Sequence, residues 1–167
     1  GGVMGSEEIQ EQQDEKGVIK KTDFKYFLMV TKGGIIKKTD LKQFSKIRAN
    51  GLTAIKLEPG DELIWVKPTT GDDNVILVTA EGKSIKFSET DVRPLGRNTR
   101  GVIAIKFKTD TDYIVGMGVI RKNEDRLFTL SEYGHGKMTK LSEYPLQKRG
   151  GTGVFTFRVT PKTGKVV

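Results

Sequence analysis

The stretch 147–153, QKRGGTG, combines residue types that could hold an anion. Lys148 and Arg149 supply positive charge, and three glycines follow them. Glycine permits φ above zero and lets backbone N–H groups approach a phosphate closely. We therefore predict a polyanion contact here. The predicted contact residues are Gln147, Lys148, Arg149, Gly150, Gly151 and Gly153. A turn that needs glycine for its geometry alone is the alternative.

Other candidates for chemistry are weak. His135 is the single histidine, which excludes a His-rich metal site, and it lies between two glycines, where we expect a turn position and no catalytic triad. The chain has no cysteine, which excludes a Cys nucleophile and thiolate metal sites. Asp72 and Asp73 lack the ligand spacing of a cation site, so we expect a solvated loop there. No apolar run approaches the roughly 20 residues of a membrane helix. We expect no metal, no cofactor, no membrane partner and a cytoplasmic location.

The charge balance favours an anionic partner. The chain has 167 residues, enough for one domain with a real core. It carries 29 Lys+Arg against 21 Asp+Glu, a formal charge of +8. Such an excess suits nucleic acid or an acidic protein surface.

Internal repeats set the expected architecture. The segments 33–44 (GGIIKKTDLKQF), 81–92 (EGKSIKFSETDV) and 133–144 (YGHGKMTKLSEY) resemble one another. So do 51–57 (GLTAIKL), 101–107 (GVIAIKF) and 153–159 (GVFTFRV). A period of about 50 residues is typical of stacked or radial supersecondary units. We predict units at about 28–75, 76–126 and 127–167, preceded by a tag or flexible tail (1–15). Residues 16–27 are a partial repeat or a junction, because 17–27 nearly copies 34–44.

Each unit is predicted to be a blade of short β-strands, since apolar and β-branched runs end at turn residues. Alternation along 51–57, 101–107 and 153–159 would turn Ile55 and Leu57 inward and Lys56 outward. We expect Trp65 to pack in or beside the core. Cations recur in register on these strands and in the loops before them. They are Lys56, Lys106 and Arg158 on the strands, and Arg48, Arg97 and Arg100 in the loops. A periodic basic rim suits DNA, although charged outward positions are also what any soluble β-protein needs.

From about residue 28 onward the chain resembles the C-terminal DNA-wrapping domain of bacterial DNA gyrase A. The motifs VTKGGIIKKTDLKQF, IRANGLTAIKLEPGDELI and IKFSETDVRPLGRNTRGVIAIKF appear in the family's order. The resemblance implies an all-β β-pinwheel, a propeller-like disc with partly exchanged strands, of which this chain would be a partial disc. It also implies that double-stranded DNA bends around a basic rim to support negative supercoiling. The remainder of gyrase A and the gyrase B protein are the implied partners, and the chain alone is expected to catalyse nothing.

The family's box has the form Gln-Arg-Arg-Gly-Gly-(Lys/Arg)-Gly, and 147–153 departs from it at Lys148 and Thr152. The downstream KTGKVV favours a degenerate copy of the box over the principal one. Two other interpretations stay open. One is the equivalent domain of topoisomerase IV, and the other is a propeller-like scaffold that binds an acidic protein. A partial disc would also leave strand edges such as FLMV (27–30) unpaired, so we expect either self-association through the terminal blades or a lower stability than that of the full-length domain.

Overall fold

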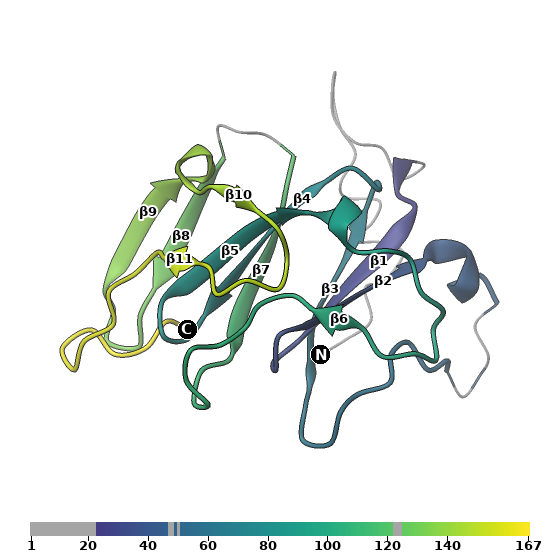
Figure 1. The fold of residues 1–167 in the computed structure, drawn as a ribbon, viewed down its shortest axis with the longest axis horizontal. Helices are drawn as coiled ribbons and strands as arrows, with labels where there is room; N and C mark the ends of the chain where they lie inside the picture. The colour runs from purple at the N-terminus through teal and green to yellow at the C-terminus, as the bar shows by residue number, and fades with distance from the viewer. Residues whose placement is uncertain (1–22, 47–48, 50, 122–124) are drawn as a thin grey trace.

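The computed structural model describes residues 23–46, 49, 51–121 and 125–167, and this part of the chain is built from β-strands (Figure 1). Short 3₁₀ turns occur at Leu41–Phe44, Glu89–Asp91 and Leu141–Glu143, and none of the described residues is α-helical. The strands are β1 (Tyr26–Thr31), β2 (Ile35–Asp40), β3 (Leu63–Thr69), β4 (Asn74–Thr79), β5 (Lys83–Ser88), β6 (Val102–Ile103), β7 (Ile114–Ile120), β8 (Arg126–Leu130), β9 (Gly136–Lys140), β10 (Leu146–Gln147) and β11 (Val154–Phe155). The all-β prediction is confirmed.

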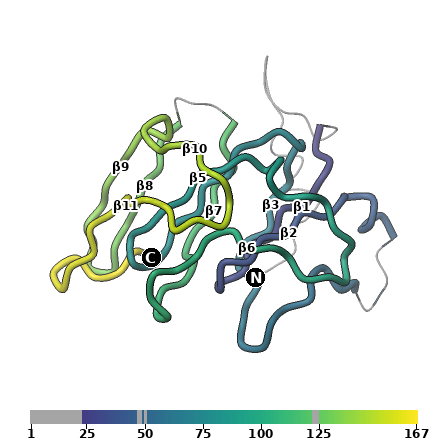
Figure 2. Tube along the Cα trace, viewed as in Figure 1, coloured from purple at the N-terminus to yellow at the C-terminus, as the bar shows by residue number. Residues whose placement is uncertain are grey.

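The strands form three sheets, and the first two are completed by strands from later in the chain. The first sheet has the order β3-β1-β2-β6, and the second has the order β10-β5-β4-β7 with β11 also paired to β5. The third contains β8 and β9. Figure 2 shows the trace after β5 returning to β2, and the trace after β9 returning to β5. We call these sheets blade 1, blade 2 and blade 3.

Each blade begins with a hairpin whose turn uses glycine in the same way. The N–H groups of Gly34, Gly82 and Gly134 donate to the carbonyls of Thr31, Thr79 and Ser131 at 3.1, 3.1 and 3.0 Å. The three glycines have φ of +86°, +86° and +84°, values that side chains with a Cβ rarely adopt. The repeated glycine therefore fixes the register of each hairpin.

Apolar faces of successive blades pack against one another. Leu28 and Val30 of blade 1 share a buried cluster with Val75, Leu77 and other residues of blade 2. A second cluster joins Ile76 of blade 2 to Leu141 beside blade 3. These side chains are almost fully buried, so blade-to-blade packing forms the core.

Three expectations about strands and burial are wrong. The segment 51–57 contains no strand, and the equivalent segments contain only the two-residue strands β6 and β11. Leu57 is exposed, whereas its counterparts Phe107 and Val159 are half-buried and pack against core clusters. The segment 27–30 is not an edge, because β1 pairs with both β2 and β3. Trp65 agrees with its prediction: it is 37% exposed and lies beside the core, lining a hollow with Ile76 and Met117, with Lys67 Nζ 5.2 Å from its ring.

Candidate nucleic-acid interface

The loop at 147–153 joins β10 to β11 and lies against blade 2 and the segment after β6. The Gly150 N–H donates to the carbonyl of Ala104 at 2.7 Å, and the Gly151 carbonyl accepts from the Lys106 N–H at 2.9 Å. Gly150 and Gly153 have φ of +86° and +75°, whereas Gly151 lies outside the left-handed region. The loop is thus held by backbone hydrogen bonds to the preceding exchanged segment.

Gly153 is required by close packing. A Cβ at this position would lie 2.1 Å from the carbonyl oxygen of Ser84, a separation that no real contact reaches. Gly101 opens the equivalent segment and is in the same situation, with the carbonyl oxygen of Ile36 at 2.3 Å. These two glycines let β11 and β6 approach β5 and β2, a role that needs no ligand.

The two cations of the loop do different things. Lys148 is 91% exposed and forms a 3.5 Å ion pair with Asp91. The Arg149 guanidinium donates from Nε to the carbonyl of Asp91 and from Nη1 to the carbonyl of Ile103, both at 3.0 Å. Lys148 therefore presents its charge to solvent, while Arg149 ties the loop to two neighbouring segments. Gln147 is half-buried, and its Oε1 has no hydrogen-bond partner among the described residues.

Arg97 repeats the contact of Arg149 one unit earlier. Its Nη1 donates to the carbonyl of Thr53 at 3.2 Å, and Thr53 is the position equivalent to Ile103. The Lys56 N–H donates to the carbonyl of Thr99 at 2.9 Å, matching the bond from Lys106 to Gly151. The two loops thus use one scheme, in which an arginine side chain and a backbone bond fasten each loop to the preceding segment.

The three cations predicted on strands are available to a partner, although none of them lies in a strand of the structure. Lys56, Lys106 and Arg158 are exposed, and none of the three forms an ion pair within the residues that the structure describes. Arg100 is also exposed but pairs with Glu58 at 2.7 Å. Arg48 lies outside the described residues. The structure therefore leaves one exposed, unpaired cation at the same position in each of the three segments.

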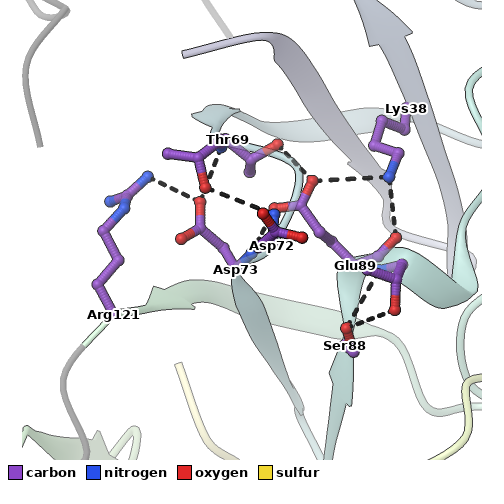
Figure 3. A network of polar contacts seen from close by, with 9 residues as sticks. Lys38, Thr69, Asp72, Asp73, Ser88, Glu89 and Arg121 are labelled. Carbon is purple, nitrogen blue, oxygen red and sulfur yellow. Dashed lines mark hydrogen bonds and ion pairs between the residues drawn. The ribbon is translucent and has the colours of Figure 1, made fainter. Parts of the chain in front are cut away.

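A buried polar network fixes blade 1 against blade 2 (Figure 3). Glu89 is fully buried and accepts hydrogen bonds from the Thr69 hydroxyl and the Asp73 N–H, both at 2.9 Å. Lys38 Nζ lies 3.6 Å from the Glu89 carboxylate and donates to the Glu89 carbonyl at 3.0 Å. Burial raises the pKa of Glu89, which the hydrogen bonds and Lys38 partly oppose. Asp73 also pairs with Arg121 at 3.3 Å, so the predicted solvated loop is wrong for this residue.

Lysines at strand centres are the features that sequence reasoning missed. Lys37 is fully buried and donates to the carbonyls of Ala54, Arg97 and Thr99. Burial first, and then the charge of Arg97, lowers the pKa of Lys37 to about 8. Lys86 Nζ donates to the Leu141 carbonyl at 2.9 Å, as Lys38 does to Glu89 one blade earlier. The only available signal was that these lysines sit in strands at repeated positions.

The described residues contain no helix that could cross a membrane and no group of three or more His, Cys, Asp or Glu side chains placed to hold a metal ion. Their fold is a row of strand-exchanged, propeller-like blades with exposed cations at equivalent positions. These features define a repeat protein of the β-pinwheel class.

Comparison with known proteins places the chain within this class. The family described as "DNA gyrase C-terminal domain, beta-propeller" matches residues 25–70, 73–121 and 125–167. The DNA gyrase A protein of Deinococcus deserti is 42% identical over 155 residues, which is 91% of this chain and 17% of that protein. The Escherichia coli protein is 38% identical over 161 residues, 93% of this chain and 18% of that protein.

Solved structures agree with this assignment. The C-terminal domain of DNA topoisomerase IV matches with a TM-score of 0.79 and 31% identity, over 85% of this chain and 44% of that one. The DNA gyrase A C-terminal domain matches with a TM-score of 0.77 and 31% identity, over 87% and 48%. The chain belongs to the family of gyrase A C-terminal domains, and the predicted β-pinwheel is confirmed. It spans less than a fifth of the length of the gyrase A proteins it matches.

Proposed function

We propose that the chain is a DNA-binding and DNA-wrapping module of gyrase A, without catalytic activity of its own. The observation that carries this proposal is the repeated exposed cation: Lys56, Lys106 and Arg158 occupy equivalent positions in successive segments. Phosphates along a duplex are also regularly spaced, so a row of cations on a rigid edge suits backbone contact without reading sequence. Lys148 adds a fourth exposed charge beside the row.

The rigidity of this edge supports bending in preference to loose association. The segments bearing Lys56 and Lys106 are fastened by backbone hydrogen bonds to the following loops. Arg97 and Arg149 fasten the same loops through their side chains. Cations on segments that are fastened in this way can hold a duplex in a bent conformation, whereas cations on a mobile tail cannot.

In the full enzyme this module would lie beside the remainder of gyrase A and work with the gyrase B protein in the bacterial cytoplasm. The repeat units at 28–75, 76–126 and 127–167 would then be three consecutive blades of a larger disc. Topoisomerase IV is the second candidate because its C-terminal domain has a similar TM-score. The gyrase A proteins that are about 40% identical favour gyrase.

Binding of the chain to duplexes of increasing length, at several salt concentrations, tests the proposal. If four cations each neutralise one phosphate, the slope of log affinity against log salt is about −3.6. Affinity should also rise with duplex length until the edge is covered. A slope near zero, or no dependence on length, would refute the phosphate contacts and favour a scaffold that binds protein.

A further inference from the structure

Two exposed apolar side chains occupy equivalent positions on the exchanged strands. Ile103 of β6 is 44% exposed and Phe155 of β11 is 71% exposed. Each is the third residue of its repeated segment, GVIAIKF or GVFTFRV. Figure 1 shows β6 and β11 alongside β2 and β5, the strands with which they pair. An exposed apolar side chain therefore recurs in two consecutive exchanged segments, three residues before an exposed cation.

Strand pairing holds the backbone of both residues in place. Ile103 pairs with Ile35 of β2, and Phe155 pairs with Lys83 of β5. The Arg149 guanidinium donates to the Ile103 carbonyl at 3.0 Å. Ile103 stays exposed although the loop of the following unit is already in place against it. Ile103 is thus exposed with the following loop in place.

A cation contacts each of the two residues: Arg149 donates to the Ile103 carbonyl, and Lys83 lies against the Phe155 ring. Lys83 Nζ lies 4.2 Å from the centroid of the Phe155 ring, and burial first, and then the charge of Lys108, lowers the pKa of Lys83. Lys106 and Arg158 each follow three residues after the apolar side chain of their own segment and are exposed. An apolar group among cations suits a ligand that offers both phosphates and an apolar surface. Duplex DNA offers both, since the sugar edges and base steps of the minor groove lie between its phosphate rows.

We propose that Ile103 and Phe155 press into the minor groove of the bound duplex and help to bend it. This inference rests on the proposed DNA binding and adds a second kind of contact to it. Apolar wedges partly unstack base steps, and flexible pyrimidine–purine steps yield most easily. The two side chains lie on consecutive blades, so they would act at successive points along the curved duplex while the lysines hold the phosphates.

The test compares variants of the 167-residue chain in affinity, salt slope and DNA bending. Losing the burial of one large apolar side chain weakens binding about tenfold, so the double variant Ile103→Ala/Phe155→Ala should bind more than about tenfold more weakly. Its salt slope should equal that of the parent chain, because an apolar contact releases no counterions. The bend, measured by energy transfer between dyes at the duplex ends, should decrease. Duplexes rich in TA and CA steps should lose the most.

Phe128→Ala is the matched control, because Phe128 is 59% exposed but lies on β8, in a sheet that contains neither β6 nor β11. It should leave affinity and bending unchanged. Phe155→Leu should retain most of the binding, and thermal unfolding of every variant checks that the fold persists. Parent-like affinity and bending in the folded double variant would overturn the inference, as would an equal loss in Phe128→Ala. A dimer of the parent chain that dissociates in Phe155→Ala would also overturn it, by showing that Phe155 contacts protein.

The experiment separates this inference from the proposed function. If the parent chain shows no salt-dependent DNA binding, the proposed function fails and the wedge fails with it. If the parent binds with a steep salt slope and the double variant binds and bends DNA equally well, only the wedge is refuted.

Discussion

Arg149 and Lys148 are adjacent in sequence, yet the structure predicts opposite effects when each is replaced by alanine. Lys148→Ala removes an exposed charge whose only described ion pair is with Asp91 at 3.5 Å. Its effect on the free energy of unfolding should stay within about 0.5 kcal/mol, as for most surface substitutions. Its effect on DNA binding should be direct, flattening the salt slope by about 0.9 through the loss of one phosphate contact.

Arg149→Ala removes two hydrogen bonds of 3.0 Å from a charged donor and frees the carbonyls of Asp91 and Ile103. Hydrogen bonds to charged groups contribute about 1.5–3 kcal/mol each when buried. The guanidinium is only half-buried, so we expect a loss of about 2 kcal/mol in total. For a domain of this size such a loss lowers Tm by about 4–8 °C.

Thermal unfolding and the salt dependence of DNA binding, measured on both variants, check this reasoning. Arg149→Lys is the control, because it keeps the charge but loses the planar fork that reaches two carbonyls. It should be nearly as destabilised as Arg149→Ala, with the salt slope of the parent chain. The reasoning is refuted if Arg149→Ala keeps the parent Tm and flattens the salt slope by about 0.9. In that event Arg149 would be a phosphate contact like Lys148.

Three further predictions concern the fold. Glu89→Gln should lower the free energy of unfolding in urea by about 1–3 kcal/mol, because an amide has one acceptor oxygen where two donors converge. Lys37 has a pKa lowered to about 8, so its unfavourable contribution is complete below that pH and is relieved as pH rises from 8 toward 10.5. Stability measured across that window should rise in the parent relative to Lys37→Met, and parallel curves would contradict this. Gly153→Ala should be far more destabilising than Gly51→Ala, since both have positive φ but only Gly153 would place its Cβ against the Ser84 carbonyl.

The repeats made the blades predictable, because three copies of a glycine turn between apolar runs can only be three similar hairpins. Pro59 and Gly60 stand at the two central positions that a type II turn prefers, and the structure has a turn there, with the Asp61 N–H donating to the Glu58 carbonyl at 3.0 Å and Gly60 at φ +81°. Strand exchange could not be derived from the residues, since alternation within 51–57 or 101–107 does not say which sheet the segment joins. The resemblance to the gyrase domain supplied it.

The burial of charged side chains was the other feature that could not be predicted from the sequence. A Lys-Lys pair in a strand predicts one side chain inward and one outward, yet Lys37 and Lys38 are both buried. Each is accommodated by oxygen atoms from segments about 15 to 60 residues away, which no local pattern indicates. Glu89 did carry a signal, because the corresponding residues of the other two units, Leu41 and Leu141, are leucines. The predicted roles of the exposed cations in DNA binding stay predictions.

Strand exchange also determines when each blade can be finished on the ribosome. Strand β2 ends at Asp40, but β6, which covers its edge, begins only at Val102. At a translation rate of about 5–20 residues per second, the edge of β2 would stay unpaired for about 3–12 s before β6 is synthesised. β5 waits in the same way, because β11 begins 66 residues after Ser88. During that interval each nascent blade presents an unpaired edge that a neighbouring nascent chain could occupy. Slower translation would lengthen the exposure, so for this family the speed of synthesis bears directly on the yield of correctly paired blades.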